Sequence, residues 1–189
     1  MLNKETELYF KNTTEWRAWL EINHANCTGI DLIFYKVGSV QESMRWEEAV
    51  QVALCFGWID STVRKIDDEK RKQRFGPRKP KSVWSKLNKT YIEKLDKEGL
   101  LHESGYTAIQ IAKENGSWES LDAVEAYAIP PDLEKAFTEN PTAYINYKAF
   151  APSYRKSYLY WLNQAKREAT RTARIIEIIA LCELNKKAR

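Results

Sequence analysis

The chain has 189 residues, 43% of them hydrophobic and 30% charged, a composition that is typical of a globular protein and excludes an intrinsically disordered one. Its formal net charge is a modest +4 at pH 7. No stretch approaches the ~18 apolar residues of a membrane span and the amino terminus does not resemble a signal peptide, so the expected location is the cytoplasm.

The first part of the chain is expected to mix helices and strands. Thr13 or Thr14 is typical of a helix N-cap, and tryptophan and leucine follow on one face. The β-branched and aromatic run over residues 30–37 predicts a strand. From Trp46 onward, apolar residues recur at i, i+3, i+4, i+7 and i+8, which predicts a helix that stops at Gly57.

A hairpin is predicted next. Residues 58–66 and 70–75 favour extended structure, and the acidic triplet over residues 67–69 between them is typical of a chain reversal. Gly76, Pro77 and Pro80 then interrupt regular structure. Ser82 is expected to cap a short helix that ends at Gly99, and another helix is expected over residues 105–114.

The last part of the chain shows helical signals only. Helices are expected to begin near Pro130, Asn140 and Ala151, and a final one carries apolar residues at helical spacing from Ile175 to Cys182. The sequence therefore predicts an α+β fold. A small antiparallel sheet with packed helices occupies residues 1–125, and an all-helical domain occupies residues 126–189, with the junction over residues 122–129.

The three cysteines argue for a reducing compartment. Cys27, Cys55 and Cys182 form no CxxC pair and no metal-ligand spacing, and their odd number argues against a disulfide framework. Cys55 and Cys182 both lie within apolar runs, so we expect them to be buried.

Basic charge is concentrated in one segment. From Arg64 to Lys89 there are eleven lysine or arginine residues and three acidic ones, a local charge of +8, so the rest of the chain sums to −4. The stretch from Gly57 to Asn88, which also carries two tryptophans, is therefore the predicted working surface.

A three-part motif in this stretch resembles a known family. Residues 53–60 read ALCFGWID, residues 74–78 read RFGPR, and residues 82–88 read SVWSKLN. Residues 130–133 read PPDL, and Ala165 and Lys166 are followed by Thr170, Arg171 and Arg174. At this spacing the chain resembles the bacterial YdeI/OmpD-associated, or bacteriocin-protection, proteins over nearly its whole length.

The resemblance implies a general role and no catalytic residues. It implies tolerance of bacteriocins or cationic antimicrobial peptides, and an association with an outer-membrane porin as envelope partner. Lys79 and Lys81 depart from the family pattern, which often has arginine there, and this keeps the charge but loses the bidentate fork.

An anion site is predicted where the motif meets a helix start. This region combines cations with the free N–H groups of a helix N-terminus, which suits a phosphate or a carboxylate. The residues concerned are Arg74, Arg78, Lys79, Lys81, Ser82 and Ser85. The alternative is that Ser82 only caps its helix and that the cations form a solvated face.

Four further residues carry both a structural and a binding interpretation. Trp58 and Trp84 could wall a groove or belong to the core. Asp60 follows an apolar run and is expected to pair with Arg74 or Arg78 rather than to act as a catalytic acid. Asn88 either binds a ligand or fixes the turn before the next helix.

No cofactor, metal site or catalytic signature is predicted. His24 and His102 have no partner at ligand spacing, and the chain contains no Gly-rich phosphate loop, no GxSxG and no HExxH. Nucleophilic catalysis would need Ser82, Ser85 or Cys55 with a base that the sequence does not show.

Three functions remain open. The first is a non-catalytic stress or antimicrobial-peptide tolerance protein whose basic groove holds an anionic small molecule or an acidic protein segment. The second is single-stranded nucleic-acid binding, and the third is an enzyme acting on a phosphorylated or carboxylated small molecule. A basic groove repels cationic peptides, so an indirect role in tolerance is favoured over sequestration.

Overall fold

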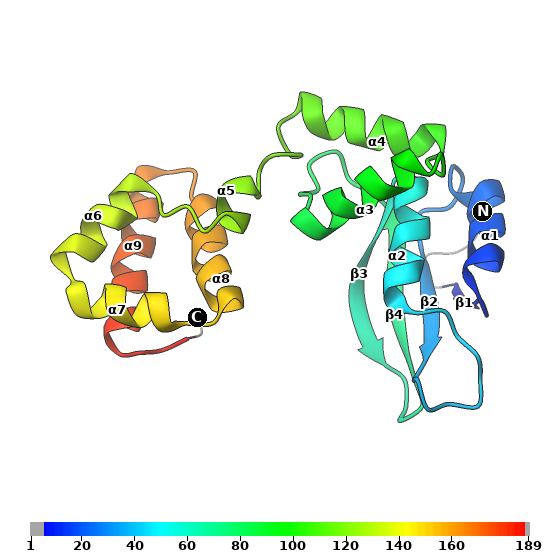
Figure 1. Ribbon diagram of the computed structural model, residues 1–189, viewed down its shortest axis with the longest axis horizontal. Helices are drawn as coiled ribbons and strands as arrows, with labels where there is room; N and C mark the ends of the chain where they lie inside the picture. Colours follow the sequence, from blue (N-terminus) through cyan, green and yellow to red (C-terminus); the bar gives the residue numbers. More distant parts are fainter. Residues whose placement is uncertain (1–5, 188–189) are drawn as a thin grey trace. The chain divides into compact units, whose positions relative to one another are not determined.

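The computed structural model describes residues 6–187, which form two compact units divided between Glu119 and Ser120 (Figure 1). Unit 1 contains β1 (Glu7–Tyr9), α1 (Thr13–Asn23), β2 (Ile30–Tyr35), α2 (Trp46–Cys55), β3 (Trp58–Lys65), β4 (Lys70–Pro77), α3 (Lys86–Lys97) and α4 (Glu103–Glu114). Unit 2 contains α5 (Asp122–Glu125), α6 (Pro131–Glu139), α7 (Pro141–Ala149), α8 (Pro152–Asn163) and α9 (Glu168–Glu183). The predicted α+β class is confirmed.

Unit 1 is built on one sheet with the strand order β1-β2-β4-β3. Strand β4 pairs antiparallel with both β2 and β3, as the sequence predicts. The short edge strand β1 pairs parallel to β2, and the sequence did not predict it. Three residues are too few to show the alternation by which a strand is recognised.

The predicted hairpin is formed by β3 and β4, with the acidic triplet at its turn. Asp67 Oδ1 accepts the backbone N–H groups of Glu69 at 2.8 Å and Lys70 at 2.9 Å, so its side chain fixes the reversal. The pairing register shifts between Asp60 and Val63, which marks a β-bulge in β3.

Helices α1 and α2 lie against one face of the sheet (Figure 1). Alternate side chains of β2, from Ile30, Leu32 and Phe34, are buried on that face, as strand periodicity requires. Trp16 and Leu20 of α1 are fully buried against them. This packing fixes the end of the sheet where β3 begins and β4 ends.

Helix α3 begins three residues later than the sequence predicts. Its N-cap is Ser85, whose side chain accepts the backbone N–H of Asn88 at 3.2 Å, whereas Ser82 lies in the preceding loop and bonds to Lys79 O through its backbone N–H. Trp84, which lies between the two serines and next to the cap, is buried in the core of unit 1.

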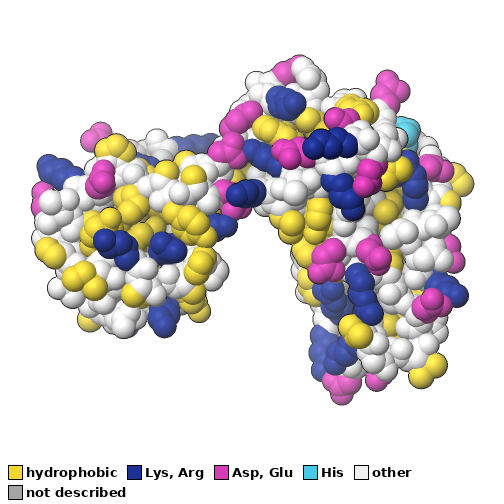
Figure 2. All heavy atoms as spheres, viewed as in Figure 1, with side chains coloured by type: hydrophobic (Ala, Val, Ile, Leu, Met, Phe, Trp, Pro, Cys, Tyr) yellow, Lys and Arg dark blue, Asp and Glu magenta, His cyan; other side chains and the backbone are white. Residues whose placement is uncertain are grey.

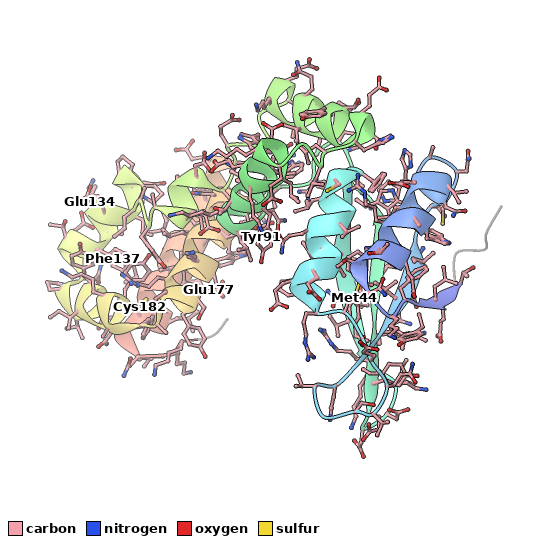
Figure 3. All side chains as sticks on the ribbon, turned by 45° about the vertical axis from the view of Figure 1, so that its right-hand side comes forward. Met44, Tyr91, Glu134, Phe137, Glu177 and Cys182 are labelled. Carbon is pink, nitrogen blue, oxygen red and sulfur yellow. The ribbon has the colours of Figure 1, made fainter. Side chains whose placement is uncertain are left out.

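Unit 2 is helical over its described residues, as predicted. Proline occupies the first turn of α6, α7 and α8, where a missing N–H costs nothing. The sequence placed the domain boundary after residue 125, whereas the division between the units falls after Glu119, because α5 packs against α8. Figure 3 labels Phe137 and Cys182, which lie in the core of this unit.

All three cysteines are buried free thiols, as the sequence predicts for Cys55 and Cys182. Among the described helices, none combines the length and the apolar character that crossing a bilayer requires.

Candidate functional site

A cavity of about 270 Å³ lies in unit 1, at the end of the sheet where β3 begins and β4 ends. Its apolar lining comes from Phe56, Trp58, Pro77, Pro80, Trp84, Ala108, Ile111 and Ala112. Its polar lining comes from His24, Arg78, Lys79, Ser104 and Thr107. The cavity thus combines a mostly apolar wall with two cations and no carboxylate.

Two glycines allow α4 to approach closely enough to form one wall of the cavity. Gly57 turns the chain between α2 and β3 with φ +70°, and a Cβ there would lie 2.8 Å from the carbonyl oxygen of Ser104. A Cβ on Gly105 would lie 2.3 Å from the carbonyl oxygen of Cys55. Both positions therefore require glycine for close backbone contact.

Arg78 is the main electrostatic feature of the cavity. Its guanidinium lies 3.6 Å from the centre of the Trp84 ring, and Nη2 donates to Val83 O at 2.6 Å. The Nε and Nη1 atoms are buried and have no hydrogen-bond partner among residues 6–187. Burial lowers the pKa of Arg78 to about 10, and the charge of Asp60 opposes part of this effect.

The two tryptophans of the motif are both core and cavity wall. Trp58 is 1% exposed, donates from Nε1 to His24 O at 3.2 Å and packs edge-on against Trp16 and Trp19. Trp84 is equally buried and contacts Trp118 at 4.9 Å between ring centres. Each ring is held rigidly, so the cavity is preformed rather than created by a rotating side chain.

The predicted pairing of Asp60 with Arg74 or Arg78 is wrong. Asp60 Oδ2 accepts a hydrogen bond from Trp46 Nε1 at 3.0 Å and another from the buried amide of Gln73. Arg74 pairs instead with Asp31 at 3.6 Å. Neutral donors satisfy the Asp60 carboxylate because β3 turns it toward α2, while Arg74 points to the opposite face of the sheet.

The structure does not bring all of the predicted site residues together. Trp58, Arg78 and Trp84 line the cavity, whereas Asp60, Arg74, Ser82, Ser85 and Asn88 are absent from its described lining. Ser85 and Asn88 close the first turn of α3. The sequence left open whether the two tryptophans belong to a groove or to the core, and it did not indicate the part of the lining that α4 supplies.

One lining residue, His24, belongs to a histidine pair that the sequence did not reveal; its partner His102 lies outside the described lining. The rings of His24 and His102 lie 4.7 Å apart, and Phe56 contacts both. His102 is the N-cap of α4, where Nδ1 accepts the backbone N–H of Ser104 at 3.1 Å. His102 occupies the position at which serine, threonine, aspartate or asparagine usually caps a helix, so a search limited to those four residue types misses it.

The contact between His102 and Ser104 is a helix cap. Ser104 Oγ lies 2.9 Å from His102 Nδ1, but it also donates to Phe56 O at 3.1 Å. The one lone pair of Nδ1 is occupied by the Ser104 backbone N–H. A histidine bound in this way cannot take the serine proton, so the pair lacks the geometry of an activated nucleophile.

In the part of the chain that the structure describes, no group of three or more His, Cys, Asp or Glu side chains is placed to hold a metal ion. What the cavity offers chemically is a desolvated cation with unsatisfied donors beside large apolar rings. This arrangement favours binding of an anionic group that carries an apolar body.

Comparisons with known proteins assign each unit separately. Residues 8–108, more than half of the chain, match the family described as a domain of unknown function (DUF8412), and the chain belongs to this family. Residues 126–185 match the family described as bacteriocin-protection, YdeI or OmpD-associated, which confirms the predicted resemblance for this part of the chain but not over nearly its whole length. No curated protein and no solved structure shows a significant match.

The family motifs of unit 2 form structural contacts. Arg171 of α9 binds both carboxylate oxygens of Asp132 in α6, with Nη2 at 2.9 Å from Oδ1. Arg174 donates to Trp161 O and lies over the Trp161 ring at 4.9 Å. These arginines tie α9 to its neighbours, which explains the motif without a ligand. The three-part motif over residues 53–88, by contrast, lies within the DUF8412 match.

Proposed function

We propose that unit 1 is a binding module for a small anionic molecule with an apolar body, held in the cavity between Trp58, Arg78 and Trp84. The observation that carries this proposal is Arg78, a partly buried cation with two buried nitrogen atoms that have no hydrogen-bond partner in the part of the chain that the structure describes. Buried donors of this kind cost free energy until an acceptor binds them. An anionic ligand supplies both the acceptor and the opposing charge.

The size and lining of the cavity select the class of ligand. About 270 Å³ is just below the usual range for small-molecule sites, so a single carboxylate or phosphate on one ring fits better than a larger ligand. Phe56, Trp58 and Trp84 supply flat apolar walls for such a ring. Ligand binding, without catalysis, is the role that these contacts support.

The bacteriocin-protection match of unit 2 supports a link between the proposed ligand binding and tolerance of antimicrobial peptides. The described lining of the cavity has two cations and no carboxylate, so the cavity repels cationic peptides. We therefore propose that the protein contributes to peptide tolerance by binding an anionic ligand. Protection would then be indirect, and peptide sequestration is not required.

The binding proposal is tested by titrating the protein with benzoate, inorganic phosphate and benzyl alcohol while following tryptophan fluorescence and heat. Benzoate is expected to bind more tightly than inorganic phosphate or benzyl alcohol, because only benzoate has both a negative charge and an aromatic ring. Arg78→Gln should weaken benzoate at least tenfold, which corresponds to loss of one charged hydrogen bond of about 1.5–3 kcal/mol.

Lys81→Gln is the matched control, since it removes one nearby positive charge from an exposed residue outside the described cavity lining. Equal affinity of the Arg78→Gln variant and the wild type would show that the cavity is not the site. A strain lacking the gene, complemented with wild type or with Arg78→Gln, tests the link to polymyxin sensitivity. Equal rescue by both forms would show that ligand binding in the cavity does not contribute to tolerance.

A further inference from the structure

A second cavity, of about 360 Å³, lies at the opposite end of the β3–β4 hairpin. It is lined by Phe34, Tyr35, Lys36, Val63, Lys65, Asp67, Lys70 and Arg71. Four of these side chains are cationic and one is acidic. In Figure 2, Lys and Arg side chains gather over this end of β3 and β4. We call residues 63–72 the distal hairpin.

The single carboxylate of this cavity is already engaged. Asp67 accepts two backbone N–H groups in the hairpin turn, and its other oxygen lies 3.8 Å from Lys70 Nζ. Lys65 pairs with Asp68, but both side chains are largely exposed, so water or another anion can replace this contact at little cost. The lining of the cavity therefore has a net positive charge, which its one carboxylate does not neutralise.

Arg71 is held in place before any ligand arrives. Its guanidinium lies 5.3 Å from the centre of the buried Phe34 ring, and Nη1 donates to Gln73 Oε1 at 3.1 Å. Gln73 is itself 3% exposed and bonded to Asp60. An arginine fixed by a ring and a buried amide loses little conformational entropy when it binds a phosphate.

Cations occupy both faces of the distal hairpin. Lys65 is paired in register with Arg71 on the side of the buried Phe75. Arg64 is paired with Lys72 on the other side, where Lys72 is already bound by Glu7 and Asp31. Lys36 joins the first pair because its backbone N–H donates to Glu69 O at 2.9 Å. Such a distribution matches a ligand with several successive negative charges better than one with a single charge.

Apolar surface lies among these cations. Val63 is 49% exposed at the cavity, and Tyr35 is partly exposed beside Lys70, whose Nζ lies 5.9 Å from the ring centre. Val63 lies on the same face as Lys65 and Arg71, whereas Tyr35 lies with Lys70 on the other face. A flat nucleobase can therefore cover Val63 while its phosphates meet the neighbouring cations. An acidic peptide that lacks aromatic residues offers charge but no flat apolar group for this surface.

We infer that the distal hairpin binds single-stranded nucleic acid, with phosphates on Lys36, Lys65, Lys70 and Arg71 and a base against Val63. This site is separate from the Trp58–Arg78–Trp84 cavity and does not depend on the function proposed for it. The two sites lie at opposite ends of the same hairpin, so each can be removed without the other.

The test is fluorescence anisotropy of the full chain with a fluorescein-labelled oligouridine of about 12 nucleotides. With four phosphates neutralised, log affinity should fall with log salt with a slope of about −2.8. The double variant Lys36→Gln/Lys65→Gln should reduce this slope to about −1.4 and weaken binding roughly 50-fold at about 50 mM salt. Both lysines are exposed, so the variant should fold normally, which circular dichroism can confirm.

The control is Lys135→Gln/Lys148→Gln, which removes the same charge from two exposed lysines of unit 2 and should leave binding unchanged. Absence of binding at about 50 mM salt, where phosphate contacts are strong, would overturn the inference. Equal loss in both double variants would show attraction by net charge alone and would also overturn it. Displacement of the oligonucleotide by polyglutamate of equal charge would reject nucleic acid as the class of ligand.

Discussion

Replacement of Arg78 by methionine separates a binding role from a structural one. Burial lowers the pKa of Arg78 to about 10. Because each pKa unit corresponds to about 1.4 kcal/mol, holding the positive charge in this site costs about 3 kcal/mol. Arg78 therefore weakens the fold through its charge, and other contacts must offset this cost.

Two contacts provide the offset. The guanidinium lies over Trp84, a desolvated cation–π contact of about 2 kcal/mol, and it donates to Val83 O, a charged hydrogen bond of about 1.5–3 kcal/mol. The gains and the cost nearly cancel. Methionine keeps an apolar side chain against the Trp84 ring, so Arg78→Met should change the free energy of unfolding by less than about 1.5 kcal/mol.

The assay is urea unfolding followed by tryptophan fluorescence, with benzoate titration of the same sample. We expect near-wild-type stability together with loss of benzoate binding. Lys81→Met, at an exposed position, should alter neither quantity. A loss of more than about 3 kcal/mol in Arg78→Met would refute the reasoning, because the guanidinium would then be a structural element whose nitrogens are satisfied in the fold.

Further predictions follow from the same contacts. Gly105→Ala should destabilise unit 1 by about 2–3 kcal/mol in urea unfolding, because its Cβ would meet a backbone oxygen at 2.3 Å, whereas Gly38→Ala, with open space around it, should have almost no effect. Burial raises the pKa values of Cys182, Tyr147 and Tyr158 to about 12. The folded state then holds more protons than the unfolded state above about pH 9, so unit 2 should lose stability steadily from about pH 9 to 12 in thermal melts, and a flat profile would contradict this. Benzoate affinity should fall as pH rises through about 10, where free Arg78 loses its charge, and a constant affinity to about pH 11 would exclude this arginine as the anion partner.

The sequence predicted most elements because their patterns are local. The buried face of α2 repeats at helical spacing, and alternate burial of Ile30, Leu32 and Phe34 defines β2. The error at the start of α3 shows the limit of such patterns. Ser82 and Ser85 are equivalent as N-caps in sequence, and only the structure shows which of them caps the helix.

The sequence by itself determined the α+β class, the hairpin with its acidic turn, the basic segment and the family of unit 2. Only the tertiary structure decided which residues of that segment form a cavity. Arg78 and Arg74 are similar in sequence, yet one faces Trp84 without a full set of partners and the other pairs with Asp31. The approach of α4 depends on Gly57 and Gly105, which lie far apart along the chain. Periodicity records which face of an element is buried, but the partner across that face is set by packing between distant segments.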